Sequence, residues 1–207
     1  MGIVVEPVGA ALLFDCYAPC SRSMAAAMHG AGFQGCVRDI DDLTAPELKD
    51  LLAEGLGVMV YQSAHGAGWV PSETLGNADG LRVVTKARAI GYAEGATIYN
   101  DIEGPITTAT SHEIAAWANA KCDVVQKAYW KDGEYIGYGT PLTPAELFHL
   151  FKATSYWHSG SNVADVETRG YAMRQVIMDI MYLGQRIDVN LAQPDKLRGC
   201  PYWMRSS

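Results

Sequence analysis

The stretch Thr97–Glu103, TIYNDIE, decides the fold when it is taken together with the segment Ser111–Lys127 that follows it. Its first half is apolar and β-branched or aromatic, which predicts a buried strand. The second segment begins SHEIAAWANA and has the length and composition of a helix. A buried strand followed by a long helix predicts one unit of a parallel sheet with helical crossovers.

The same alternation extends in both directions from this unit. Short apolar runs predict seven further strands, at Ala11–Tyr17, Phe33–Arg38, Leu56–Gln62, Tyr135–Gly139, Ala153–Trp157, Ala172–Met178 and Arg186–Leu191. Further helices are predicted at Ser21–Gly30, Thr44–Glu54, near Leu81–Tyr92, and at Thr143–Phe151. Thr44 and Glu47 form a capping-box pattern, which Thr143 repeats. The residues Lys131-Asp132-Gly133 are typical of a turn before the strand at Tyr135.

Eight strands with helices between them fit two architectures, an open doubly wound sheet and a closed (β/α)8 barrel of the TIM type. No Gly-x-Gly-x-x-Gly follows the first strand and no phosphate-binding loop occurs, which disfavours a dinucleotide-binding sheet. We therefore expect an α/β protein, a compact (β/α)8 barrel with an irregular C-terminal part, formed by residues 1–207 as a single domain. The 207 residues are few for this fold, so some helices should be short or absent.

Composition narrows the classes of function. Apolar residues make up 49% of the chain and charged residues 19%, enough to bury a full core. Lysine and arginine number 16 against 23 acidic residues, and the net charge of −7 disfavours nucleic acid and anionic membranes as partners. No stretch reaches the roughly 18 apolar residues of a membrane span. The first residues, MGIVVEPVGAALLFD, carry no Lys or Arg, so we expect no encoded signal peptide.

Residues that bind metals or act as nucleophiles are scattered. The five cysteines match neither a disulfide framework nor a zinc spacing and are expected to be buried thiols, with a Cys16–Cys20 pair as the alternative. The five histidines are dispersed, and neither His-Glu-x-x-His nor Gly-x-Ser-x-Gly occurs. We therefore expect no metal and no cofactor.

In a barrel, functional side chains lie at the carboxyl ends of the strands. Asp101 and Glu103 are the sharpest pair there, because residues at i and i+2 of a strand face the same side, with Cα atoms roughly 6.5–7 Å apart. Burial of two like charges should raise one pKa, so that one carboxyl keeps its proton beside an ionised partner. Glycosidic cleavage needs this arrangement. The other strand ends supply Asp15, Tyr61, Gln62, Tyr138, Trp157 and Asp188.

The same residues also have structural explanations. Arg38 or Arg174, in comparable strand positions, could neutralise the Asp101 and Glu103 pair. Asp15 could cap the helix that begins near Ser21, and Asp188 could be structural as well. The aromatic candidates for stacking on sugar rings could instead pack in the core.

Four motifs, FDCYAP (Phe14–Pro19), VYQ (Val60–Gln62), IYNDIE (Ile98–Glu103) and RIDVNL (Arg186–Leu191), carry a resemblance to a known family. An Asp after the first strand, Asp-x-Glu after a middle strand and Asp-x-Asn-Leu in the last strand resemble the lysozyme-type muramidases of glycoside hydrolase family 25. The individual motifs are most similar to a related "glycoside hydrolase-like" domain of bacteria and phages whose function is unknown. Cys16-Tyr17-Ala18-Pro19 departs from the muramidase pattern, as does the missing aromatic residue beside Gln175.

The resemblance implies a barrel hydrolase that cleaves a bacterial cell-wall glycan, with the N-acetylmuramic acid linkage of peptidoglycan as the expected bond. Glu103 would be the general acid, and Asp101 would stabilise charge or position the substrate N-acetyl group. Asp15 and Asp188 would line the cleft, and substrate contacts would come from Tyr61, Gln62, Tyr138 and Trp157. Cell-wall polysaccharide would be the partner, without membrane insertion. Phage lysis, or a place in the virion beside other virion proteins, would bring the protein to the wall.

Two other hypotheses stay open from the sequence. The first is a catalytically inert glycan-binding or structural virion protein that retains the barrel and its acidic pocket. The second is an open α/β sheet that binds a small metabolite, which the strand order would distinguish from a barrel.

Overall fold

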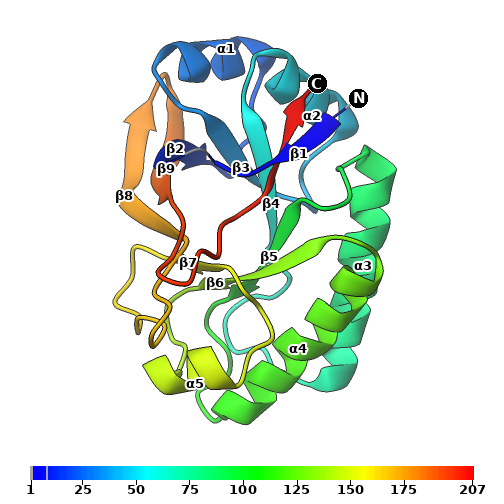
Figure 1. Cartoon of the computed structure of the whole chain (residues 1–207), viewed down its shortest axis with the longest axis vertical. Coiled ribbons are helices and arrows are strands. Elements are labelled where there is room, and N and C mark those ends of the chain that lie inside the picture. The colour runs from blue at the N-terminus through cyan, green and yellow to red at the C-terminus, as the bar shows by residue number, and fades with distance from the viewer. Residues whose placement is uncertain (1, 8) are drawn as a thin grey trace.

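Eight strands form a closed barrel at the centre of the molecule (Figure 1). The computed structural model describes residues 2–7 and 9–207, so Met1 and Val8 of the predicted domain lie outside the described residues. The barrel strands are β2 (Ala11–Asp15), β3 (Gly35–Asp39), β4 (Gly57–Gln62), β5 (Thr97–Ile102), β6 (Lys131–Ile136), β7 (Tyr156–His158), β8 (Met173–Tyr182) and β9 (Gln185–Ala192). Pairing between β4 and β5 and between β9 and β2 closes the ring. This closure rules out the open sheet and confirms the predicted barrel of eight strands.

Five helices lie outside the barrel, one after each strand from β2 to β6. They are α1 (Arg22–Gly30), α2 (Ala45–Ala53), α3 (Glu73–Ile90), α4 (Ser111–Lys127) and α5 (Pro144–His149). In the part of the chain that the structure describes, no helix follows β7 or β8. The expectation of short or absent helices is thus confirmed. The structure contains a closed mixed barrel without a helix after every strand.

The last barrel strand departs from the predicted parallel arrangement. Strands β2 to β8 run parallel, whereas β9 runs antiparallel to both of its neighbours, β8 and β2. Only Leu183 and Gly184 connect β8 to β9, and both have positive φ angles of 51° and 79°. A two-residue connection of this kind forms a hairpin and is too short for a parallel crossover. The irregular C-terminal part of the prediction is therefore a β-hairpin.

Two short strands close the amino-terminal end of the barrel. β1 (Gly2–Val5) pairs with β10 (Trp203–Ser206), and β10 pairs with β4 through Met204 and Val58. The Trp203 ring belongs to the barrel interior and lies 2.8 Å from the point where a Cβ would stand on Gly35 or Gly57. Glycine at these two positions leaves space for the indole. The sequence did not predict either strand, because each spans four residues and has no helix beside it.

The local predictions have mixed outcomes. Thr143 and Glu146 form the predicted capping box of α5. Thr44 caps α2, but the predicted reciprocal bond from Glu47 is wrong, because the Glu47 carboxylate binds Arg38 and the Cys20 amide inside the molecule. The predicted turn Lys131-Asp132-Gly133 is also wrong, because these residues begin β6.

Two further predictions concern the start of α3 and the state of the cysteines. α3 begins at Glu73, well before the predicted Leu81. All five cysteines are free thiols, as predicted; four of them are buried, whereas Cys200 is half-buried. Within the described ranges, none of the helices combines the length and the apolar character needed to cross a bilayer.

Helices α3 and α4 pack closely through glycines, and this contact generates a stability prediction. A Cβ on Gly76 would overlap the backbone carbonyl of Trp117 in α4. Replacing an exposed helical glycine by alanine usually stabilises by about 1 kcal/mol. We expect Gly76→Ala instead to lower the free energy of unfolding by roughly 1–3 kcal/mol, the usual effect of overpacking. Urea denaturation measures this, and Gly30→Ala is the control, because Gly30 ends α1 with open space around it. A Gly76→Ala protein more stable than wild type would contradict this packing.

Candidate functional site

The acidic residues predicted from the sequence meet in one pocket at the carboxyl end of the parallel strands. A cavity of about 250 Å³ is lined by Asp15, Asp101, Glu103 and Asp188, together with aromatic and polar side chains. A larger cavity of about 470 Å³ lies elsewhere, between α2 and β10, and is mostly apolar with Lys49 as its charged residue. The four predicted carboxyls therefore all lie in the smaller, acidic pocket.

Alternation along β5 explains why Asp101 and Glu103 share this pocket. Tyr99 packs in the barrel interior, whereas Ile98 and Ile102 pack in the cores between the barrel and the helices. Asp101 and Glu103 follow Tyr99 at intervals of two and so face the same inner side, as predicted. Glu103 comes directly after the end of the strand and therefore lies nearer the mouth than Asp101.

Burial and mutual repulsion make this pair unusual. Burial, followed by the negative charge of Glu103, raises the pKa of Asp101 to about 8, against a hydrogen bond from Ser63. Burial also raises the pKa of Glu103, opposed by hydrogen bonds from the Tyr138 backbone and the Tyr135 side chain. One Asp101 oxygen, Oδ1, is buried and has no hydrogen-bond partner. Asp101 therefore keeps its proton at neutral pH, and burial also favours the protonated form of Glu103.

The ion-pair explanation of these acids is wrong. Arg38 binds Glu47 at 2.8 Å, outside the barrel wall, and Arg174 binds Asp165 at 2.7 Å. Across residues 2–7 and 9–207, no salt bridge involves Asp101 or Glu103.

The backbone around Glu103 fixes the direction of its side chain. The Trp69 indole N–H donates to the Glu103 carbonyl at 2.7 Å. A Cβ on Gly137 would overlap Cγ and the carboxyl group of Glu103. Glycine at position 137 therefore provides the space in which the Glu103 side chain lies.

Asp15 and Asp188 form the opposite side of the pocket. They are direct partners across the antiparallel pair β2 and β9. Burial raises the pKa of Asp15 to about 7, opposed by hydrogen bonding to Asn190 and assisted by the charge of Asp188. Burial also raises the pKa of Asp188. Because β9 is antiparallel, Asp188 reaches the mouth from the first half of its strand, and not from a carboxyl end as predicted.

Two amide side chains hold these carboxylates. The Gln175 Nε2 donates to Asp188 at 3.1 Å and to Asp15 at 3.4 Å. Its Oε1 accepts from the Tyr135 hydroxyl at 3.2 Å and the Gly160 amide at 2.9 Å, which fixes the orientation of the amide. Asn190 donates to Asp15 at 2.5 Å and accepts from the Trp157 indole at 2.9 Å.

The predicted substrate-contact residues have different locations. Tyr61, Tyr138 and Trp157 line the pocket, with Tyr138 in the loop after β6. Trp157 is 2% exposed and packs against three tyrosine rings, so it forms the floor. Gln62 lies outside the pocket, because it follows the inward-facing Tyr61 and its side chain donates to Asp41 at 3.4 Å.

Several residues that line the pocket were not predicted from the sequence. They are Tyr17, Ser63, Tyr135, Ser161, Gln175 and Met178. Ser63 follows Tyr61 at an interval of two, so alternation could have found it. In the described part of the chain, no three His, Cys, Asp or Glu side chains are grouped to hold a metal ion.

A closed α/β barrel with four carboxyls in a pocket at one end has the architecture of a glycoside hydrolase-like barrel. The model of the Rv2525c-like, glycoside hydrolase-like domain matches residues 28–189. The chain therefore belongs to this family, which confirms the relationship predicted from its motifs.

Solved structures agree with the fold. The Tat-secreted protein Rv2525c of Mycobacterium tuberculosis has a TM-score of 0.66 at 16% identity, covering 89% of this chain and 95% of that one. The autolysin LytC of Streptococcus pneumoniae, solved with a synthetic peptidoglycan ligand, has a TM-score of 0.63 at 15% identity over 88% of this chain and 46% of that one. The catalytic domain of endolysin ply40, from bacteriophage P40 of Listeria monocytogenes, has a TM-score of 0.55 at 12% identity, with 88% and 92% coverage. No curated protein matches the chain. The fold is thus related to those of peptidoglycan-lytic enzymes.

The raised pKa of Asp101 makes stability depend on pH in a defined direction. An unfolded aspartate ionises near pH 4, whereas the folded Asp101 keeps its proton up to about pH 8. The wild-type protein therefore loses stability relative to Asp101→Asn as the pH rises from 4 to 8. At pH 8 we expect Asp101→Asn to be more stable by at least about 1.4 kcal/mol, the value of one pKa unit. Thermal or urea unfolding at several pH values measures this. The exposed Asp42→Asn is the control, and an Asp101→Asn effect that does not change with pH would contradict the prediction.

Proposed function

We propose that this protein hydrolyses glycosidic bonds of a bacterial cell-wall glycan, and that its substrate is the N-acetylmuramic acid linkage of peptidoglycan. The observation that carries the proposal is the Asp101 and Glu103 pair, which lies in an open acidic pocket without a cationic partner. The relation of the fold to LytC, whose structure holds a synthetic peptidoglycan ligand, supports this choice of substrate.

Glu103 is the proposed general acid, because it lies at the mouth where a glycan chain can reach it. It donates its proton to the glycosidic oxygen as the bond from that oxygen to the anomeric carbon breaks. The leaving sugar departs as an alcohol. The ionised Glu103 then takes a proton from the water that attacks the anomeric carbon, which restores the starting state.

Because Asp101 keeps its proton at neutral pH, it is proposed to position the N-acetyl group of the reacting sugar by hydrogen bonding, and not to stabilise positive charge. Asp101 lines the pocket, and its buried Oδ1 has no hydrogen-bond partner in the protein. Asp15 and Asp188 face this pair across the pocket, held by Gln175 and Asn190. Tyr61 and Tyr138 are proposed to contact the sugar rings, whereas Gln62 is no longer a candidate because of its position.

The cell wall is the proposed site of action, and phage lysis or a virion component is the proposed route to it. The support for the phage route is the shared fold with an endolysin of bacteriophage P40. Other virion proteins would then be further partners.

The enzymatic proposal is tested by lysis of purified peptidoglycan, followed as loss of turbidity and release of reducing ends. We expect wild type to be active and Glu103→Gln to lose about 10²–10⁴-fold, the usual contribution of general acid–base catalysis. The exposed Glu94→Gln is the matched control and should keep wild-type activity. Activity should fall as the pH rises through the raised pKa of Glu103, because the general acid then loses its proton.

The outcome also separates the competing hypothesis. Wild type and Glu103→Gln that bind peptidoglycan equally, with neither releasing reducing ends from any wall fraction, would contradict the hydrolase. Such a result would support the inert glycan-binding protein in its place.

A further inference from the structure

The most exposed aromatic side chain at the acidic pocket is one that the proposed mechanism does not use. Tyr17 is 79% exposed and lies directly after β2, two residues from Asp15. It lines the acidic pocket and also a neighbouring cavity of about 290 Å³. The two cavities share Asp15, Tyr17, Met178 and Asp188, so Tyr17 lies on the boundary between them.

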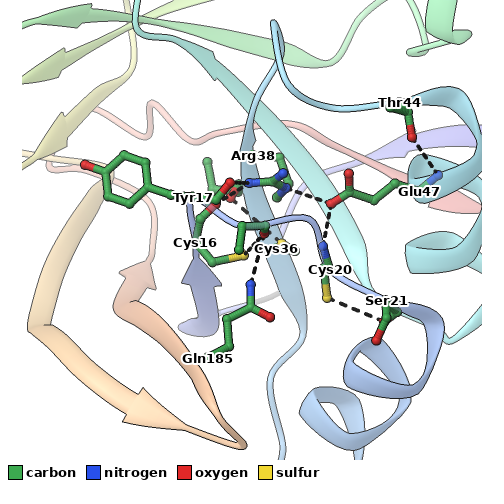
Figure 2. Close-up of polar contacts among 11 residues, drawn as sticks. Cys16, Tyr17, Cys20, Ser21, Cys36, Arg38, Thr44, Glu47 and Gln185 are labelled. Atoms are coloured by element: carbon green, nitrogen blue, oxygen red, sulfur yellow. Dashed lines mark hydrogen bonds and ion pairs between the residues drawn. The ribbon is translucent and has the colours of Figure 1, made fainter.

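The loop that carries Tyr17 is fixed by a buried ion pair (Figure 2). Arg38 is fully buried, and its guanidinium donates to the carbonyls of Cys16 and Tyr17, the latter at 3.1 Å. Arg38 also binds Glu47 at 2.8 Å, and the same Glu47 oxygen accepts the Cys20 amide at 2.8 Å. One ion pair thus holds the backbone on both sides of the exposed segment Tyr17–Pro19.

A third contact fixes the middle of this loop. Gln185, at the start of β9, donates from its side chain to the Ala18 carbonyl at 3.0 Å. The Tyr17 ring points away from this set of contacts (Figure 2). Its position is therefore set by the backbone and not by packing of the ring.

Burial of an ion pair rarely stabilises a fold, because the lost hydration of both charges offsets their attraction. Here the pair instead orders a short loop whose only large exposed side chain is Tyr17. A fixed loop that presents an aromatic ring loses little entropy when a ligand binds, which is how preorganised binding sites gain affinity.

The surroundings of Tyr17 indicate the class of ligand. A tyrosine ring offers an apolar face for the apolar side of a sugar and a hydroxyl for hydrogen bonding. A tyrosine hydroxyl keeps its proton up to about pH 10, so the Tyr17 hydroxyl is a hydrogen-bond donor at neutral pH. The exposed Met178 also lines both cavities and adds a second apolar surface. A glycan chain fits these surfaces, because its sugar rings offer apolar faces to the aromatic and thioether groups and hydroxyls to the polar ones.

We propose that Tyr17 is a glycan-binding residue that stacks on a sugar ring at the boundary between two subsites, one in the acidic pocket and one in the adjoining cavity. This inference rests on the proposed function. The two subsites would accommodate sugars on either side of the bond that is cleaved. The segment Cys16-Tyr17-Ala18-Pro19 would then determine substrate specificity in this chain, at the point where it departs from the muramidase pattern.

The test uses binding of soluble, uncrosslinked peptidoglycan glycan strands, measured by calorimetry in a Glu103→Gln background so that no cleavage occurs. We expect Tyr17→Ala to weaken the Kd about tenfold, equivalent to about 1.4 kcal/mol, and Tyr17→Phe to stay within about threefold. Gln185→Ala, which only loosens the loop, should weaken binding by a smaller factor. Tyr129→Ala is the control, because Tyr129 is 73% exposed and precedes β6 at the other end of the barrel.

The outcomes separate this inference from the proposed function. In the cleavage-competent protein, Tyr17→Ala should raise KM more than it lowers kcat. Equal binding by Tyr17→Ala and its parent would overturn the role of Tyr17, while lysis by wild type would leave the hydrolase proposal intact. A protein that neither binds the strands nor lyses walls would overturn both.

Discussion

Burial of the neighbouring Asp101 and Glu103 carboxyls inside the barrel is the constraint on which the arrangement of the acidic pocket depends. Side chains alternate along β5, so a closed barrel that buries Tyr99 must also direct both carboxyls inward. No cation of the described residues forms a salt bridge with them, and burial keeps a proton on the pair. The barrel supplies the rigidity that holds the two groups together in this buried position. Trp203 packs in the barrel interior near the starts of β3 and β4, at the opposite end from the pocket.

The buried carboxyls of the pocket lower the stability of the fold, which is typical of a functional site. Asp15 and Asp188 add further negative charge, and the amides of Gln175 and Asn190 hold them in place. The buried ion pair of Arg38 with Glu47 lies on the outer side of the wall and fixes the loop of Tyr17. The unpaired carboxyls therefore face the cavity, whereas the ion pair of Arg38 with Glu47 positions the Tyr17 loop at the edge of the cavity.

The sequence predicted those features that depend on local periodicity. The strand at TIYNDIE, the long helix after it and the convergence of Asp15, Asp101, Glu103 and Asp188 all follow from alternation and from the geometry of barrels. The antiparallel direction of β9 was not predicted, because a Leu-Gly turn resembles many loops. The predicted position of Gln62 in the pocket is wrong, because side chains alternate along β4 and Gln62 faces the side opposite to the inward-facing Tyr61. Tyr17 and Gln175 were missed as pocket residues because their positions come from tertiary contacts, with Arg38 and with Tyr135, that no local pattern reveals.

Titration of the aspartate carboxyl carbons by carbon-13 NMR tests the central claim most directly. The assignment of each resonance follows from the Asp101→Asn and Asp15→Asn variants. The structure predicts a midpoint of about 8 for Asp101 and about 7 for Asp15. Midpoints near 4 for both residues, as in an exposed aspartate, would contradict a pocket that retains a proton at neutral pH.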